Sequence, residues 1–472
     1  MSAQLTATLR RLVAEDLASN DELEGEDRKE YARQRIFALL DEFALEETGP
    51  AAGDRSVADD QRLAQQVLDA LFGMGRLQVL IDDQGIENID INGYDRVWAT
   101  FADGSKRLMP PVADSDDELV DLIRSAAGRF GLSERRFDNG RPELDLQLPD
   151  GSRLSALMAV STRPSISIRR HRFTDLSIAD LVSLGTMGDD VATLLSAAVR
   201  ARKNIVVAGA MNSGKTTLLR ALAAEIPPRE RIVTIEQALE LGLERAPDRH
   251  PDMVALEARP ANVEGAGQIS VADLVRRALR MNADRVIVGE VLGDEILPML
   301  NAMSQGRSGS MCTVHANSSA GVFRRIASYA VQAPERLPLE ATNLLVAGAV
   351  DLVVFLDSEA NDFRGEDVGD VGVGRGWDRS EVAGSGDAVD GNAANGCAPD
   401  GGFGAQSHRT RFVSSIREVV DAEGSQVISN EIYAPGPDRR ATVNSPLRPQ
   451  TLEELMRCGY EPSTEYAGAR WT

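Results

Sequence analysis

Apolar residues in the first 47 positions of the chain recur at the spacing of an α-helix. One such run extends from Leu5 to Leu17 and another from Tyr31 to Phe43. Since every third or fourth position is apolar in both, each helix would bury one face. The stretch "ETGPAAGDRS" is typical of a linker, and "QRLAQQVLDALFG" after it predicts another helix. Residues 1–60 are therefore expected to form a helical N-terminal segment.

From about Val79 the apolar period changes to two, which indicates β-strands. "RVWATFADGSKRLM" predicts a hairpin with Asp103-Gly104 at its turn, and "ELDLQLPDGSRLSALM" predicts another with Asp150-Gly151. The helical pattern "DELVDLIRSAAGRFG" lies between them. Residues 61–173 are therefore expected to form a small α+β domain.

Beyond residue 173, strands and helices alternate, which predicts an α/β domain with a parallel sheet over 174–472. The expected strands are "NIVVAG", "RIVTIE", "DRVIVGE", "SMCTVHA" and "DLVVFL". Because ligands of open α/β sheets bind at the carboxyl ends of strands, Glu236, Glu290 and His315 should converge near Gly209. Residues 358–408 are rich in Gly and Asp and poor in large apolar residues, so they are interpreted as a disordered insertion before further β-structure.

The stretch "VVAGAMNSGKTTLLRAL" (206–222) has the spacing G-x-x-x-x-G-K-[ST] between a strand and a helix. In such a loop the backbone N–H groups face a phosphate, Lys215 reaches the outer phosphates and Thr216 offers a hydroxyl to Mg²⁺. The pattern predicts a site for a nucleoside triphosphate. The alternative is a chance Gly-rich turn with an exposed lysine.

Three acidic residues are candidates for the chemistry of phosphoanhydride hydrolysis, which needs a carboxylate to position water and Mg²⁺ to neutralise charge. Glu290 ends an apolar strand and is the candidate for handling water. Glu236 and Glu240 could each bind Mg²⁺ or water. A solvated or helix-capping glutamate is the alternative for all three.

Composition narrows the class of protein. The formal net charge of −22 weighs against a nucleic-acid partner, because duplex binding depends on clustered Lys and Arg. Cys312, Cys397 and Cys458 lie far apart, which fits a reduced, cytoplasmic setting. The longest apolar run, "NLLVAGAVDLVVFL", is too short to span a bilayer, so no transmembrane segment is expected.

Four motifs together resemble those of the type II/type IV secretion ATPases, and specifically their CpaF/TadA-like branch. In chain order they are "GAMNSGKTTLLRAL", "TIEQALEL", "RPANVEGAGQISVADLVRRALRMNADRVIVGE" and "GSMCTVHANSS". The resemblance covers about residues 75–357 and the C-terminal strands. It implies a RecA-like P-loop NTPase domain after a smaller N-terminal domain. It also implies ATP and Mg²⁺ as cofactors, and a cytoplasmic homo-hexamer that works on an inner-membrane platform protein of a pilus or secretion system.

The same resemblance assigns roles to individual residues. Arg153 and Arg169 would approach the phosphates from the N-terminal domain, Arg280 would lie near the nucleotide, and His315 would sense phosphate; ordinary surface charges and a satisfied buried histidine are the alternatives. The residues expected at the nucleotide are Gly209, Asn212, Ser213, Gly214, Lys215, Thr216, Thr217, Arg153, Arg169, Arg280 and His315. Thr216, Glu236 and Glu240 are expected at Mg²⁺, and Glu290, Glu240 and Lys215 are expected to be catalytic.

Some positions depart from the family pattern. Gln237 stands where the family has Asp, Arg307 replaces a histidine, Leu292 replaces an arginine, and Asn212 replaces a glycine of the loop. Because glutamine cannot bind Mg²⁺ as a charged ligand, Glu240 becomes more important as a candidate ligand for Mg²⁺. The sequence thus predicts an ATPase motor for a type IV-like (Flp/Tad) pilus or a related secretion machine. The alternatives are a structural ring component that binds ATP with little hydrolysis, and a DNA-translocating RecA-like ATPase.

Overall fold

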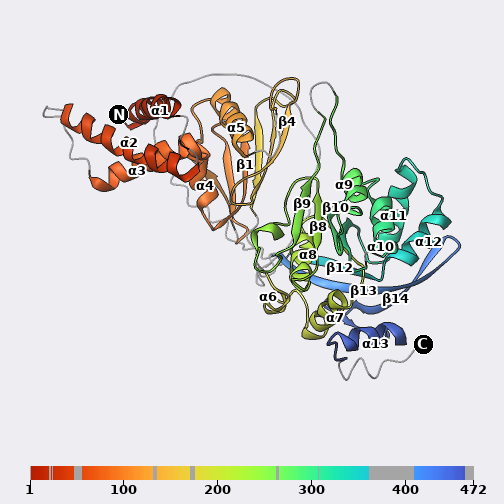
Figure 1. Cartoon of the computed structure of the whole chain (residues 1–472). Helices are drawn as coiled ribbons and strands as arrows, with labels where there is room; N and C mark the ends of the chain where they lie inside the picture. The colour runs from red at the N-terminus through yellow and green to blue at the C-terminus, as the bar shows by residue number, and fades with distance from the viewer. Residues whose placement is uncertain are drawn as a thin grey trace, which may run out of the picture.

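The computed structural model describes residues 2–20, 23, 25–46, 56–101, 103–130, 136–170, 176–261, 265–306, 308–360 and 409–462. Figure 1 shows a helical segment at one end of the molecule, a first sheet beside it and a larger sheet beyond that. Arg307, Cys397 and most of the predicted insertion (361–408) lie outside the described residues. The first three residues of that insertion, 358–360, belong instead to a strand, because they pair with residues 409–411.

Three helices form the N-terminal segment: α1 (Ser2–Ala18), α2 (Gly25–Glu46) and α3 (Val57–Phe72). Their apolar faces share one core that includes Leu9, Ile36 and Val67. Ser56 begins α3 with a capping box to Asp59. The sequence-based boundary at residue 60 therefore falls within α3, which packs with the two helices before it.

Six antiparallel strands form the first sheet, in the order β3-β2-β1-β6-β5-β4. Their bounds are β1 (Ile86–Asn92), β2 (Val97–Phe101), β3 (Lys106–Met109), β4 (Glu143–Gln147), β5 (Arg153–Leu157) and β6 (Ser165–Arg169). α5 (Asp116–Phe130), with the short η1 (Gly75–Leu77) and α4 (Gln78–Asp82), packs on the face that carries Ile89 and Ile168. Both predicted hairpins are present. The pleat places Ser167 and Arg169 on the opposite face.

A nine-stranded sheet forms the centre of the larger domain, in the order β15-β14-β13-β12-β7-β11-β10-β8-β9. The six parallel strands are β7 (Ile205–Gly209), β8 (Ile232–Glu236), β9 (Met253–Glu257), β10 (Arg285–Val291), β11 (Met311–His315) and β12 (Leu352–Ala360). The antiparallel strands are β13 (Arg409–Glu423), β14 (Gln426–Pro435) and β15 (Ala441–Val443). The five predicted parallel strands are confirmed. β9, the edge strand of the sheet, was not predicted; all of its residues are half-buried.

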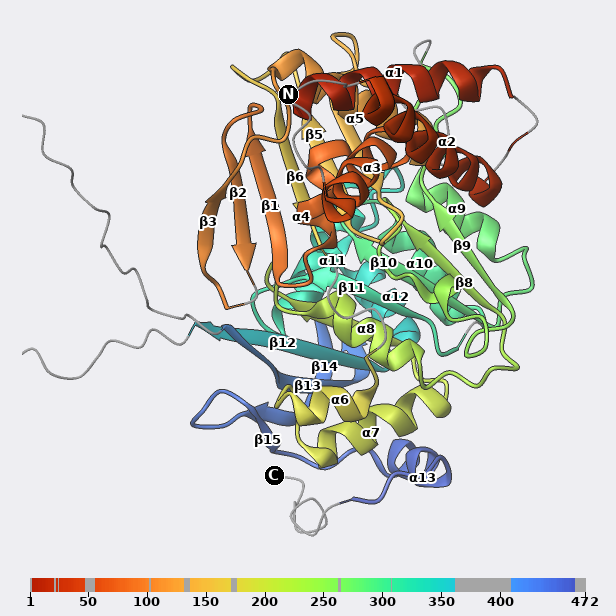
Figure 2. The same cartoon turned by 90° about the vertical axis from the view of Figure 1, so that its left-hand side faces the viewer.

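Helices cover both faces of this sheet: in Figure 1 the teal helices lie above the blue strands and the olive helices lie below them, and Figure 2 shows the same helices in a view turned by 90°. α6 (Ile178–Ser183), α7 (Asp189–Arg200), α8 (Lys215–Ala223) and α13 (Pro449–Arg457) pack on one face. α9 (Val271–Ala278), α10 (Ile296–Ser304), α11 (Gly321–Gln332) and α12 (Leu339–Ala349) pack on the other, and η2 (Leu243–Arg245) follows β8. Because the central strands are buried on both sides, they appear in the sequence as continuous apolar runs. The fold is thus a RecA-like α/β domain preceded by a smaller α+β domain. None of the helices in the described ranges has the length and apolarity needed to span a membrane.

Candidate functional site

The loop between β7 and α8 is shaped to receive an anion. Gly214 precedes the helix at φ +93°, and Asn212 lies at φ +61°, so two loop residues have left-handed backbone conformations. No side chain caps the N-terminus of α8. The Ser213 hydroxyl is buried and has no hydrogen-bond partner. The first-turn N–H groups and this hydroxyl are therefore available for a phosphate.

Lys215 connects the loop to the next strand, β11. Its ammonium donates to the carbonyl of Ala210 at 2.9 Å and lies 3.2 Å from Nδ1 of His315. The residue is only 7% exposed. Burial lowers the pKa of Lys215; the charge of Arg169 acts in the same direction, and Glu290 and Glu240 oppose it. A phosphate bound in this loop would stabilise the charge of the desolvated ammonium.

His315 joins Lys215 to Glu290. Nε2 of His315 lies 2.5 Å from Oε1 of Glu290, while Nδ1 faces the lysine. Because an ammonium has only donors, Nδ1 must accept, and Nε2–H then donates to the carboxylate. Residues from α8, β11 and β10 thus form one chain, as expected from the positions at the carboxyl ends of these strands. Glu290 keeps 39% of its side chain exposed, which leaves it accessible to water.

Glu236 has a different environment from Glu290. Its Oε1 accepts hydrogen bonds from the backbone N–H groups of Glu240 and Leu241, each at 3.0 Å. Burial raises the pKa of Glu236 to about 8. The carboxyl fixes the backbone of the following loop through these two hydrogen bonds, and its burial disfavours the charged form that binds Mg²⁺.

The segment that follows Glu236, residues 237–241, is held in place by Arg220 of α8. Arg220 donates through Nε to the carbonyl of Leu241 at 2.8 Å and also hydrogen-bonds to the carbonyl of Glu240. Gln237 is exposed, whereas the charge of Glu240 acts on Lys215. Of Glu236 and Glu240, the two carboxylates predicted at Mg²⁺, Glu240 is the one whose charge acts on Lys215.

Gly289 is a site residue that the sequence analysis missed. A Cβ at this position would lie 2.8 Å from Cγ and 2.9 Å from Oε1 of Glu236. The glycine therefore makes the space in which the Glu236 side chain lies. The only signal in the sequence is that a residue without a side chain precedes Glu290.

Two arginines of the first sheet lie side by side, since Arg153 and Arg169 are register partners on β5 and β6. The charge of Arg169 reaches Lys215, so the N-terminal domain contributes to the loop's surroundings. Arg153 instead lies 3.7 Å from a carboxylate oxygen of Asp145. A hydrogen bond of 2.8 Å from Arg141 to the carbonyl of Ala261 also joins the domains.

Arg280 is placed away from this group. It is exposed just after α9, and the next residue, Met281, accepts a hydrogen bond of 2.9 Å from Arg231, which precedes β8. This is the amino edge of the sheet, opposite the phosphate loop. Within one chain Arg280 is therefore not brought to Lys215. Thr216 and Thr217 lie in the first turn of α8, both half-buried.

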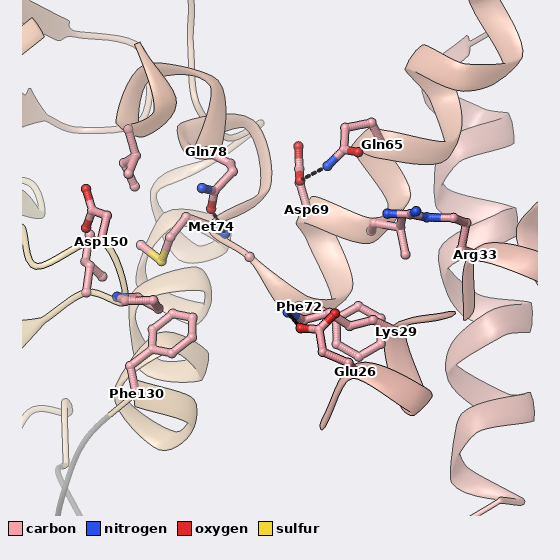
Figure 3. A pocket seen from close by; sticks show the side chains of 15 residues that line it. Glu26, Lys29, Arg33, Gln65, Asp69, Phe72, Met74, Gln78, Phe130 and Asp150 are labelled. Atoms are coloured by element: carbon pink, nitrogen blue, oxygen red, sulfur yellow. Dashed lines mark hydrogen bonds and ion pairs between the residues drawn. The ribbon is translucent and has the colours of Figure 1, made fainter. Parts of the chain in front are cut away.

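A pocket of about 340 Å³ lies elsewhere, between the helical segment and the first sheet. In Figure 3, Lys29, Arg33 and Asp69 line one side, and Phe130 and Asp150 line the other. Its lining mixes both signs of charge and contains none of the residues predicted for the phosphate. Nor do the described residues hold any group of three or more His, Cys, Asp or Glu side chains that could bind a metal ion by themselves.

The fold and the loop define a RecA-like P-loop protein. Residues 73–432 match the model of the family described as type II/IV secretion system protein, and the chain belongs to that family. The branch within the family stays a prediction.

The chain is also similar to individual named proteins. A protein of Mycobacterium tuberculosis whose name refers to conjugal transfer is 37% identical over 283 residues, which cover 58% of this chain and 77% of the relative. The type IV secretion system protein PtlH of Bordetella pertussis is 32% identical over 314 residues, covering 61% and 90%. Among solved structures, the VirB11 ATPase of Brucella suis is 27% identical and covers 65% of this chain and 94% of that chain, with a TM-score of 0.33.

Proposed function

We propose that this chain binds ATP at the 209–217 loop and hydrolyses it to drive a pilus-assembly or secretion machine. The observation that carries the proposal is the contact chain from Lys215 through His315 to Glu290. It connects a residue that would contact phosphate to one that could position water. A loop that bound nucleotide only as structural support would not need the second half of this chain.

The residues present fit a nucleotide with Mg²⁺. The open N-terminus of α8 and the unpartnered Ser213 hydroxyl would receive phosphate oxygens. The Thr216 hydroxyl and the Glu240 carboxylate are oxygen donors of the kind that Mg²⁺ prefers, and the ion would neutralise phosphate charge. Glu236 would support these two Mg²⁺ ligands by fixing the backbone of the loop that carries Glu240.

The remaining residues would act on the attacking water and on the developing charge. Glu290 would orient the water, and the hydrogen bond from His315 would keep its carboxylate in one position. Arg169 would bring positive charge from the N-terminal domain toward the phosphates. A site assembled from two domains would couple hydrolysis to their relative motion.

For the machine, the motifs favour the CpaF/TadA-like branch and hence a Flp/Tad-type pilus. The names of the relatives, conjugal transfer and type IV secretion proteins, support a secretion system of this general kind. The chain would work as a homo-hexamer in the cytoplasm, bound to a membrane platform protein. Light scattering with a non-hydrolysable ATP analogue should give the hexamer mass, and a monomer mass at high concentration would contradict this.

Phosphate release by the full chain with ATP and Mg²⁺ tests the activity. Hydrolysis by the wild type that Lys215→Ala abolishes would support the proposal. Nucleotide binding without phosphate release would instead support the structural ring component. Release that depends on single-stranded DNA would support the DNA-translocating ATPase.

A further inference from the structure

The phosphate loop is also contacted by a strand from the far end of the chain. Nε of Arg411, on β13, donates to the carbonyl of Asn212 at 2.9 Å. The Cδ atom of the same side chain lies 3.3 Å from where a Cβ of Gly214 would be. The arginine therefore lies along the loop across its two residues with left-handed backbone.

The sheet register explains how a residue about 200 positions away reaches the loop. Leu356 of β12 pairs with Gly209, the last residue of β7, and β13 pairs with β12 so that Ser358 faces Arg411. Two strand pairings thus place Arg411 at the level of the loop that follows Gly209. No sequence motif marks this arginine.

We propose that Arg411 is a positioning residue of the phosphate loop, which holds the Asn212–Ser213 peptide in the orientation needed to bind the nucleotide. The Asn212 carbonyl accepts from Arg411 of β13, and the N–H of the same peptide, on Ser213, donates to the carbonyl of Ala210 at 3.3 Å, so both ends of the peptide are held. If the peptide rotated, the carbonyl would face the phosphates and repel them. The inference rests on the proposed function, because the nucleotide is the ligand for which the loop is held.

Two conservative variants separate the hydrogen bond from the charge. Arg411→Gln places Nε2 the same number of bonds along the side chain as the arginine Nε, so the donor stays and the charge is lost. Arg411→Lys keeps the charge but places a methylene at that position. Arg411→Ala removes both. Arg439→Ala is the control, since Arg439 lies in the turn between β14 and β15 and its guanidinium pairs with Asp357 of β12.

The measurements are the Kd for a non-hydrolysable ATP analogue, kcat and KM for ATP, and amide exchange of the 209–217 region without nucleotide. A lost hydrogen bond of ordinary strength predicts that Arg411→Ala raises Kd and KM by about 5- to 10-fold. In Arg411→Ala the kcat value should change little, and amide exchange of the loop should be faster than in the wild type. Arg411→Gln should restore the affinity for nucleotide, whereas Arg411→Lys should not. The control should match the wild type.

Three results would overturn the inference. They are wild-type affinity and exchange in Arg411→Ala, restoration by Arg411→Lys but not by Arg411→Gln, and equal loss in the Arg439→Ala control. If the wild type itself binds no nucleotide, the proposed function fails. The inference, which needs that ligand, fails with it, while unchanged nucleotide binding in Arg411→Ala defeats the inference alone.

Discussion

Nε2 of His315 lies 2.5 Å from Oε1 of Glu290, at the carboxyl ends of two adjacent parallel strands. The opposite ring nitrogen, Nδ1, faces the Lys215 ammonium. A single imidazole therefore connects the residue that would contact phosphate to the carboxylate that would orient water.

Lys215→Ala should weaken both binding and turnover of ATP, because the ammonium would contact phosphate in the ground state as well as in the transition state. Fluorescence titration for binding and phosphate release for turnover provide the measurements. Lys203→Ala is a control, since Lys203 pairs with Glu454 and precedes β7 at its amino end. That variant should lose thermal stability but bind nucleotide as the wild type does. Normal affinity in Lys215→Ala would contradict the assignment.

Gly289→Ala should lower both stability and hydrolysis, because its Cβ would lie within 3 Å of the Glu236 side chain. Overpacking of this kind costs about 1–3 kcal/mol. Denaturant unfolding and phosphate release would measure the loss. Gly348→Ala on α12 is the matched control, since its Cβ would meet no atom within 4 Å.

A second substitution tests the cause of that effect. Adding Glu236→Asp to Gly289→Ala shortens the side chain that the new methyl group meets, and it should recover part of the lost stability. If the double variant is no more stable than the sum of the single changes predicts, the proposed contact is not the reason.

The stability of the wild type should depend on the protonation of His250. Burial, with the charge of Arg249, lowers the pKa of this histidine below its usual 6.5, and its Nδ1 has no hydrogen-bond partner. Because the unfolded chain binds the proton more readily, the contribution of neutral His250 is present above about pH 6.5 and is lost as the pH falls below it. His250→Phe removes the titration.

The measurement is the free energy of unfolding of both proteins at pH 7.5 and pH 5.5. The wild type should lose more stability than His250→Phe between these values. An equal loss in the two proteins would show that His250 does not titrate in this range.

Replacing residues 361–408 with a short Gly/Ser linker should preserve the fold and basal hydrolysis. The composition of the segment offers little apolar surface to bury. On either side of it β12 and β13 pair as far as Ala360 and Arg409, so a short turn can close the hairpin. Circular dichroism and phosphate release on the shortened chain give the comparison. Loss of solubility or of hydrolysis would show that the segment contributes to the folded domain.

Local patterns in the sequence were sufficient to predict the phosphate loop and the strands that carry Glu236, Glu290 and His315. Each depends on residues close together in the chain, and parallel strands bring their carboxyl ends to one edge. The same reasoning could not distinguish Glu236 from Glu240, because their difference lies in burial and in two backbone hydrogen bonds. The identity and spacing of residues in the sequence do not reveal burial or backbone hydrogen bonds.

Contacts made through tertiary packing were not accessible from the sequence. Gly289 matters only because the Glu236 side chain of the neighbouring strand occupies its space. Arg411 reaches the loop through two strand pairings. Arg280 follows a helix that leads to the amino edge of the sheet, which its motif does not reveal. In each case the deciding information is the position of a distant segment.

Binding and hydrolysis of ATP by Glu290→Gln, measured side by side, test the proposed role of this carboxylate. The substitution preserves shape and removes the charge that would orient water, so the variant should bind ATP about as the wild type does while releasing phosphate roughly 10²-fold or more slowly. Glu257→Gln, which changes a carboxylate at the end of the edge strand β9, serves as the control. Phosphate release from Glu290→Gln at the wild-type rate, with unchanged affinity, would contradict the role of Glu290 and favour a nucleotide site without catalysis by this carboxylate.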